Sequence, residues 1–570
     1  MSGSTQVSPQ IQSTHGIFAL IEPGFSESKK RSNALFWLAL AAILIVGAFL
    51  RLYQIGSKTI WLDEAFSIWM ARQTLPDMLR YALNFDTHPP FYYLLLHLWM
   101  QLGYGAAWLR SLSALAGVLT IPAIFLLGRR IAGATVGWLA AVLFSVSALN
   151  IYYSQETRMY AQLTLLATLS LWVTVRLLTD RRTAAVPIGQ QLAEFFKPGR
   201  QAGFEQPFPE NSAVQPSAAR RWLALEAIST DLTWIGYVLF TGLTWYSQSS
   251  SLFLPVAING FVVGLMIFRK IRPGKSGQFQ PPSFSNWFWA QVALFLFVSP
   301  WLVAFYFQSR GIDQQFWLTR PSPRTVLTVI KGLLSGEQLP YRGIPLEVIW
   351  AAFSSLALLG VFFFRKKLAR LVFLVMIFAT PIVCMYIISL RRPIFYLRPL
   401  VWLTVPAFVL LAAGIAQLRF RPLMLAGLTL LVFSNFSSVQ YSYNKLINED
   451  WSGAASYVAQ NVQSGDVLVF NASDTQIPFE YYYDSAAHPV EMHGAPADLF
   501  DRGLLEPIMT EQDLPHLQQI TQGHARVWLI YSHNWFTDPN NLAQQYLANH
   551  FALLDQKKLY EVQIFLYEAR

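Results

Sequence analysis

Acidic residues and a histidine gather at the two ends of one short stretch, residues 61–90. The stretch opens with WLDEAF, which holds Asp63 and Glu64, and closes with DTHPPFYY, which holds Asp86 and His88. It follows an apolar segment that is long enough to enter a membrane. Ionisable groups beside a bilayer are costly, so they indicate a functional site. The alternative is a solvated loop that happens to hold acids.

The adjacent pair of carboxylates could supply a general base. A carboxylate within hydrogen-bond reach of a hydroxyl or amine can take the proton that develops when this group attacks another molecule. We expect Asp63 to have this role. Glu64 lies on the same turn and cannot point to the same atom, so we expect it to orient the loop or to pair with a cation.

Two further polar segments, YSQETRMY at 153–160 and RRPIFYLRP at 391–399, also join apolar runs. An arginine cluster at membrane depth favours a bound phosphate, because the guanidinium fork matches phosphate oxygens. The alternative is that one arginine pairs with Glu156 or Asp63. The phosphate-binding candidates are Arg398, His88, Arg391 and Arg392, and the candidates for the rest of the substrate site are Asp86, Glu156, Arg158, Tyr153 and Tyr160.

Several of these candidates have a second interpretation. Glu156 could simply bridge to Arg158, and the tyrosines could form an aromatic belt at the membrane interface. His88 could neutralise a phosphate or ligate a divalent metal. A lone histidine is weak evidence for a metal site, so both roles stay open.

The composition is that of a polytopic membrane protein. Of the 570 residues 54% are hydrophobic and only 13% are charged, against about 25% charged residues in soluble domains. Residues 440–570 hold 6 Lys and Arg against 16 Asp and Glu, while the rest of the chain is strongly basic. Its basic residues sit at the ends of apolar runs rather than in one patch, which argues against nucleic-acid binding. The single cysteine, Cys384, excludes an internal disulfide.

The basic clusters fix the membrane topology. Eleven spans place the clusters near residues 129, 176–182, 269–272, 365–367 and 419–421 on the cytoplasmic side, as the positive-inside rule requires. The expected spans are residues 34–50, 108–128, 133–151, 160–178, 233–248, 251–268, 287–307, 346–364, 368–390, 397–416 and 422–439. The first is uncleaved, since no small-residue cleavage site follows it.

The segments between the spans complete this topology. Residues 1–33 form a disordered cytoplasmic tail and residues 179–232 a cytoplasmic insertion. Phe91–Met100 is too short to span, so we expect an interfacial or re-entrant helix that begins at Pro89-Pro90. Residues 51–107 then form one outside loop, and the span count places the segments 153–160 and 391–399 on the same outer face.

Beyond residue 440 the pattern changes to that of a small α/β domain outside the membrane. DVLVF (466–470), RVWLIY (526–531) and EVQIFLY (561–567) are typical of buried strands. Helical patterns lie between them, near residues 451–461, 475–484 and 540–549.

The order of these motifs resembles a known family. WLDEAF, then DTHPPFYYLLLHLW, a run ending in LGRR, and YSQETRMYAQL are similar to the GT-C glycosyltransferases. They are most similar to the bacterial family 39 group, the relatives of dolichyl-phosphate-mannose–protein mannosyltransferases and of the aminoarabinose lipid A transferase. The match is dense over residues 45–180, thinner at 385–420, where FYLRPLVWLTVP stands, and loose in the last domain.

This resemblance implies a membrane glycosyltransferase of the bacterial plasma membrane, active on its periplasmic or extracellular face. Its donor would be a polyprenyl-phosphate sugar, its acceptor a protein, lipid or glycan, and its acidic pair Asp63 and Glu64. Where the lipid A enzymes have Glu-Lys before Pro-Pro, this chain has Thr87-His88, so the metal stays open and His88 could replace the lysine. Two alternatives are a polyisoprenoid-lipid transporter or flippase and a transferase with an oligosaccharide donor.

Overall fold

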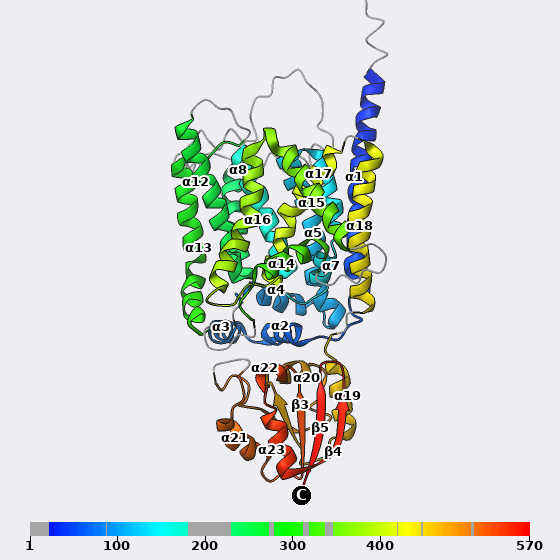
Figure 1. The fold of residues 1–570 in the computed structure, drawn as a ribbon, viewed down its shortest axis with the longest axis vertical. Coiled ribbons are helices and arrows are strands. Elements are labelled where there is room, and N and C mark those ends of the chain that lie inside the picture. The colour runs from blue at the N-terminus through cyan, green and yellow to red at the C-terminus, as the bar shows by residue number, and fades with distance from the viewer. Residues whose placement is uncertain are drawn as a thin grey trace, which may run out of the picture.

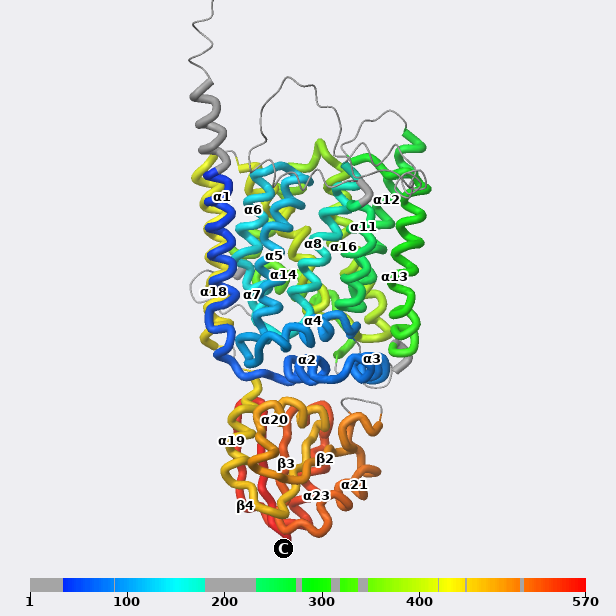
Figure 2. Tube along the Cα trace, turned by 180° about the vertical axis from the view of Figure 1, so that it is seen from behind, coloured from blue at the N-terminus to red at the C-terminus, as the bar shows by residue number. Residues whose placement is uncertain are grey.

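The computed structural model consists of a helical bundle with a small sheet domain at one end (Figures 1 and 2). It describes residues 22–86, 88–179, 230–272, 279–311, 318–336, 346–418, 420–445, 448–502 and 507–570. Most of the expected insertion at 179–232, and the first 21 residues of the expected tail, therefore lie outside the described residues.

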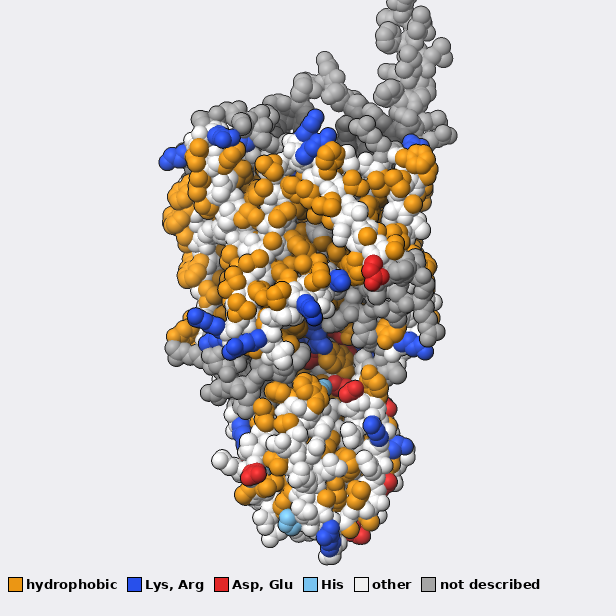
Figure 3. Space-filling model, in the orientation of Figure 1, with side chains coloured by type: hydrophobic (Ala, Val, Ile, Leu, Met, Phe, Trp, Pro, Cys, Tyr) orange, Lys and Arg blue, Asp and Glu red, His pale blue; other side chains and the backbone are white. Residues whose placement is uncertain are grey.

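The bundle is built from long apolar helices. They are α1 (Glu22–Leu52), α5 (Ala106–Ala132), α8 (Tyr160–Thr179), α11 (Thr230–Ser247), α12 (Phe253–Ile271), α13 (Phe284–Gly311), α15 (Leu346–Phe363), α16 (Leu368–Ser389), η6 (Arg398–Leu403) with α17 (Thr404–Gln417), and α18 (Arg421–Asn444). Within the described residues, nine helices are long and apolar enough to cross a membrane, or ten if one bent pair is a single span. The bundle surface in Figure 3 is largely apolar, as contact with lipid requires. The remaining expected span, 233–248, corresponds to α11, which packs against α8 and α13.

The expected third span, 133–151, is not one straight helix. It consists of α6 (Ala134–Ser145) and α7 (Ala148–Ser154), which meet at an angle of 57°. The fully buried Arg51 donates to the carbonyls of Phe144 and Ser145 at the break, at 3.2 and 3.0 Å. A cation from α1 thus satisfies backbone oxygens that the break releases, which the hydrophobicity pattern could not reveal.

Three short helices close one end of the bundle, as expected for the outside loop. They are α2 (Leu62–Arg72), α3 (Leu75–Asn84) and α4 (Phe91–Met100) (Figure 2). α4 starts directly after Pro90 and is ten residues long, so the expected short helix at this place is confirmed. α3 begins at the N-cap Thr74, whose hydroxyl accepts from the amide of Asp77.

Two other helical segments differ from the expectation. α1 begins at Glu22, so the second part of the expected tail continues the first helix. α14 (Pro323–Ser335) was not anticipated; it opens with a capping box at Ser322 and packs against α7, α17 and η6.

The C-terminal domain has a five-stranded sheet with the order β2-β1-β3-β5-β4. Its elements are α19 (Trp451–Asn461), β1 (Val467–Asn471), α20 (Gln476–Tyr482), β2 (Glu491–Gly494), α21 (Leu514–Thr521), β3 (Arg526–Tyr531), α22 (Asn534–Thr537), α23 (Leu542–His550), β4 (Phe551–Lys558) and β5 (Gln563–Ala569). β1, β2 and β3 run parallel, and β5 is antiparallel to β3 and β4. The three expected strands are present, whereas the short β2 and the mostly exposed β4 were not expected, because neither carries a buried apolar run.

The domain packs against the end of the bundle that carries α2 and α3 (Figure 1). Its Phe500 ring lies against Trp69, Tyr81 and Phe85, with centroids 4.7–5.2 Å apart. The amide of Ile60 donates to the hydroxyl of Tyr482 at 2.6 Å. The last bundle helix, α18, extends to Asn444, so the domain begins a few residues after the expected boundary at 440.

Candidate active site

Asp63 lies in the first turn of α2, at the junction of the bundle and the C-terminal domain. Acidic residues are favoured in the first turn of a helix because the helix dipole is positive there. One carboxylate oxygen, Oδ2, accepts from Nη1 of Arg398 at 2.6 Å. The two side chains are 30% and 28% exposed, so the pair faces open space rather than the core.

Arg398 is the first residue of η6, where Pro399 follows it, as expected for a helix start. Its guanidinium also lies over the ring of Trp61, 4.9 Å from the centroid. Of the three candidate arginines, Arg398 is the one that meets the acidic pair. Arg391 is exposed on the turn after α16, and Arg392 is half-buried beside it.

Glu64 is turned away from this open space. Its carboxylate is fully buried and accepts two bonds from the guanidinium of Arg110, at 2.8 and 2.6 Å, and one from the amide of Thr157. Arg110 also donates to the carbonyls of Ile55, Lys58 and Thr59. Glu64 therefore pairs with a cation and, through it, anchors the loop before α2, so both expectations for this residue are met. This geometry does not favour a proton-accepting role for Glu64.

Arg158 holds the backbone of Asp63 in place. Its Nη1 donates to the Asp63 carbonyl and to the Ser67 hydroxyl, both at 3.1 Å. Burial raises the pKa of the Asp63 carboxyl, but the charges of Arg158 and Arg398 outweigh this effect and hold it below its usual range. Asp63 is therefore ionised at neutral pH. The interpretation that Arg158 bridges to Glu156 is not met, because in the described part of the chain no ion pair joins them.

Asp86 and His88 form a second polar pair beside the first. Asp86 is 4% exposed and accepts from His88 Nδ1 at 2.9 Å and from the Tyr93 hydroxyl at 2.5 Å. Burial raises the pKa of the Asp86 carboxyl, but the interactions with His88, Tyr93 and Arg158 together hold this pKa below its usual range. His88 is also close enough to lower the pKa of Asp63. No group of three His, Cys, Asp or Glu among the described residues could hold a metal ion.

Tyr153 and Tyr160 are packed inside the protein. Both are 1% exposed, and their ring centroids are 4.8 Å apart. They therefore do not form an aromatic belt at the membrane interface, and instead line the interior near Arg158.

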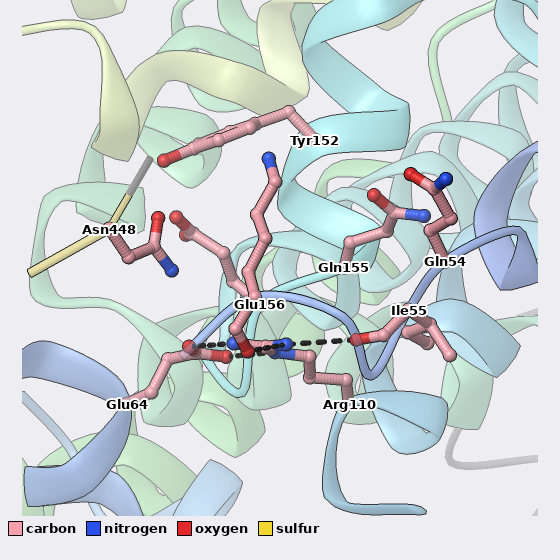
Figure 4. Close-up of a pocket in the computed structure, with 9 residues that line it drawn as sticks. Gln54, Ile55, Glu64, Arg110, Tyr152, Gln155, Glu156 and Asn448 are labelled. Carbon is pink, nitrogen blue, oxygen red and sulfur yellow. Dashed lines mark hydrogen bonds and ion pairs between the residues drawn. The ribbon is translucent and has the colours of Figure 1, made fainter. Parts of the chain in front are cut away.

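Glu156 lies in a polar pocket next to the Glu64–Arg110 pair (Figure 4). The open space there is about 310 Å³, solvent at its mouth included, and the other lining residues are Gln54, Ile55, Lys58, Tyr152, Gln155 and Asn448. Glu156 is 5% exposed, and its Oε2 has no hydrogen-bond partner among the described residues. Burial raises its pKa to about 7. Glu156 is thus available to a polar group that enters the pocket.

The sequence motifs missed two residues that the C-terminal domain brings to the site. Glu449 Oε2 accepts from the amide of Leu62 at 3.1 Å, directly before Asp63. Its other oxygen lies 3.3 Å from Nε2 of His533. Neither residue lies in a motif or near the candidates along the chain, so only the fold could reveal them.

The comparisons with known proteins support the fold. A family model described as dolichyl-phosphate-mannose-protein mannosyltransferase matches residues 87–190. The crystal structure of ArnT from Cupriavidus metallidurans in the apo state is similar, with a TM-score of 0.56 and 13% identity over 94% of this chain and 98% of that chain. The same protein bound to undecaprenyl phosphate gives a TM-score of 0.53 and 13% identity, over 93% and 98% of the chains. Comparison with curated protein sequences finds no significant match.

At 13% identity, the similarity to ArnT shows a shared fold and no more. The chain has the GT-C fold, with its long apolar helices and an added C-terminal α/β domain, and the similarity extends over nearly the whole of both chains. The resemblance to GT-C glycosyltransferases of the family 39 type, which rested on sequence motifs, is confirmed by the family model and by this fold.

Proposed function

We propose that the protein is a membrane glycosyltransferase that moves a sugar from a polyprenyl-phosphate carrier to an acceptor. The observation that carries this proposal is the half-open contact between the Asp63 carboxylate and the Arg398 guanidinium. A general base and a phosphate-binding cation lie together there, at the end of a GT-C bundle. The similar structure of ArnT bound to undecaprenyl phosphate supports a donor of this class.

In the proposed reaction Asp63 takes the proton from a hydroxyl or amine of the acceptor. The acceptor oxygen or nitrogen bonds to the anomeric carbon of the sugar, and the bond from that carbon to the phosphate oxygen breaks. Its electron pair leaves with the phosphate. Arg398 stabilises the charge that develops on this leaving group; a guanidinium has five N–H donors, so several remain beyond the one that meets Asp63.

The other residues position this pair. Glu64 and Arg110 hold the loop that leads into α2, and Arg158 holds the backbone of Asp63. His88 is the second candidate for the donor phosphate, since its ring lies beside Asp86 near the same site and can donate a hydrogen bond. We propose that the face with these residues is periplasmic or extracellular, and that the membrane is the bacterial plasma membrane.

The experiment uses the full chain in lipid nanodiscs. Polyprenyl-phosphate donors with different labelled sugars are incubated with peptide, lipid and glycan acceptors, and undecaprenyl phosphate binding is titrated separately. We expect transfer with one donor–acceptor pair and saturable binding of the lipid phosphate. Movement of the labelled lipid between leaflets without transfer would show a flippase instead, and activity only with oligosaccharide donors would show an oligosaccharyl transferase.

A further inference from the structure

The parallel part of the C-terminal sheet points its carboxyl edge at the active site. In open α/β sheets, ligands bind outside the carboxyl ends of the strands. β1 and β3 are neighbours, and their last residues, Asn471 and Tyr531, are paired in register. The helices that follow these strands, α20 and α22, lie on the side of the domain that meets α2 (Figure 1).

His533 lies on the turn that leaves this edge, two residues after the end of β3. Its φ of 55° is in the left-handed region, which residues other than glycine rarely adopt and which asparagine, aspartate and histidine adopt most readily. Such a conformation persists only where the surrounding structure imposes it, and it is common at functional sites. The turn thus fixes the backbone from which the imidazole projects.

Two contacts link this imidazole, through Glu449, to Leu62, the residue before Asp63. Nε2 of His533 lies 3.3 Å from Glu449, and the other oxygen of Glu449 accepts from the amide of Leu62. The charge of His533 also reaches Asp63 and lowers the pKa of that carboxyl. The side chain of His533 is 31% exposed. Figure 3 shows a hollow at this junction, with acidic and basic side chains inside it.

The bundle and the domain therefore approach Asp63 from different sides. Arg398 and Arg158 both belong to the bundle, which is where a membrane-bound donor must lie. His533 comes from the domain outside the bundle. His533 faces Glu449 through Nε2 and its side chain is 31% exposed, so an acceptor that enters the junction can approach the exposed part of this ring.

We propose that His533 is an acceptor-binding residue, which holds the attacking hydroxyl or amine of the acceptor beside the Asp63 carboxylate. This inference rests on the proposed function. It assigns the C-terminal domain a direct part in the reaction: the domain supplies the acceptor side of a site whose donor side is built by the bundle.

The test uses the full chain in nanodiscs, with the donor–acceptor pair found active for the wild type. His533→Gly removes the imidazole and suits the left-handed backbone, so it should fold. His533→Asn suits the same backbone and keeps a shorter hydrogen-bonding group. We expect the KM for the acceptor to rise roughly five- to tenfold in His533→Gly, the loss expected for one hydrogen bond, and less in His533→Asn. The affinity for undecaprenyl phosphate should stay within about twofold.

The control variants separate binding from a structural role. His550→Gln changes an exposed histidine of the same domain, on α23, and should leave both constants unchanged. Phe500→Leu loosens the packing of the domain on α2 and α3. It should lower the melting temperature and leave the acceptor KM close to that of the wild type. An unchanged acceptor KM in His533→Gly would overturn the inference, and so would an equal loss of undecaprenyl phosphate affinity. A wild type inactive with every pair would instead refute the proposed function, and this inference with it.

Discussion

The carboxylate of Asp63 and the guanidinium of Arg398 lie 2.6 Å apart, although 335 positions separate them in the sequence. The contact joins α2 to the start of η6. The two side chains are 30% and 28% exposed, so breaking this pair should cost less than the ~3–5 kcal/mol of a fully buried pair. The melting temperature of each variant at these positions therefore accompanies its activity as a readout.

Asp63→Asn should abolish transfer while the protein still folds and binds undecaprenyl phosphate. The amide keeps the size of the side chain but cannot take a proton. A general base contributes about 10²–10⁴-fold in rate, so we expect a loss in this range. The measurements are turnover, melting temperature and lipid-phosphate affinity of the purified variant. Asp501→Asn, an exposed position of the C-terminal domain, is the matched control; turnover near that of the wild type in Asp63→Asn would remove Asp63 from the mechanism.

Arg398→Ala should weaken binding of the donor and lower turnover together, because the same guanidinium holds the phosphate and stabilises it as it leaves. A hydrogen bond to a charged group is worth about 1.5–3 kcal/mol, which corresponds to a loss of roughly ten- to 150-fold. Arg398→Lys should recover only part of this loss, since lysine lacks the planar fork.

Donor titration in nanodiscs measures this effect. Arg391→Ala gives the comparison, since Arg391 is exposed on the nearby turn, and its effect should be much smaller. Unchanged donor affinity in Arg398→Ala would move the phosphate site to His88 or to the other two arginines.

Much of the bundle follows from hydrophobicity alone. A segment that crosses lipid must satisfy its own backbone, so long apolar runs predict helices and basic clusters predict which ends lie together. The break after Ser145 was not predictable, because it is stabilised by Arg51, 94 positions away in the sequence. In the C-terminal domain, β1 and β3 were predictable as buried apolar runs, whereas β4 is mostly exposed and carries no such signal.

The part of the site that comes from residues 61–90 was predictable from the sequence. The acidic pair and Asp86 lie close together along the chain, and the cost of burying charge marked them as functional candidates. Asp63 and Glu64 have different roles because Arg110 binds only Glu64. This contact depends on the packing of α5 against the loop, which the sequence does not show. Glu449 and His533 come from another domain, and no local pattern marks them.

Arg110→Met should destabilise the protein strongly. It leaves the buried Glu64 carboxylate without its cation and three backbone carbonyls without their donor. Removing one partner of a buried ion pair costs about 3–5 kcal/mol, while replacing both partners by apolar residues costs much less. Glu64→Leu combined with Arg110→Met should therefore melt at a higher temperature than Arg110→Met alone. Equal melting temperatures would show that the lost backbone bonds, rather than the unpaired charge, set the cost.

The C-terminal domain and residues 51–107 should lie on the non-cytoplasmic side. The structure brings them to one end of the bundle. The basic η5 (Phe364–Lys366) follows α15 at the opposite end of the bundle. Cys384→Ser removes the single cysteine, and Asp484→Cys and Lys366→Cys then introduce exposed thiols on the two sides. In intact cells an impermeant thiol reagent should label residue 484 and not residue 366. The reverse pattern would invert the topology and place the site inside.

Glu156 should make the protein less stable as the pH rises. Burial raises the pKa of its carboxyl from 4.5 to about 7, so between these values the folded state binds more protons than the unfolded state and stability falls with increasing pH. At 1.36 kcal/mol per unit, the full effect is about 3 kcal/mol. Glu156→Gln cannot ionise, so its melting temperature relative to wild type should be higher at about pH 8 than at about pH 5. Glu480→Gln, at an exposed position, is the control. The same pH dependence in wild type and Glu156→Gln would show that Glu156 is already paired, by a substrate group or by Lys58, and is ionised throughout this range.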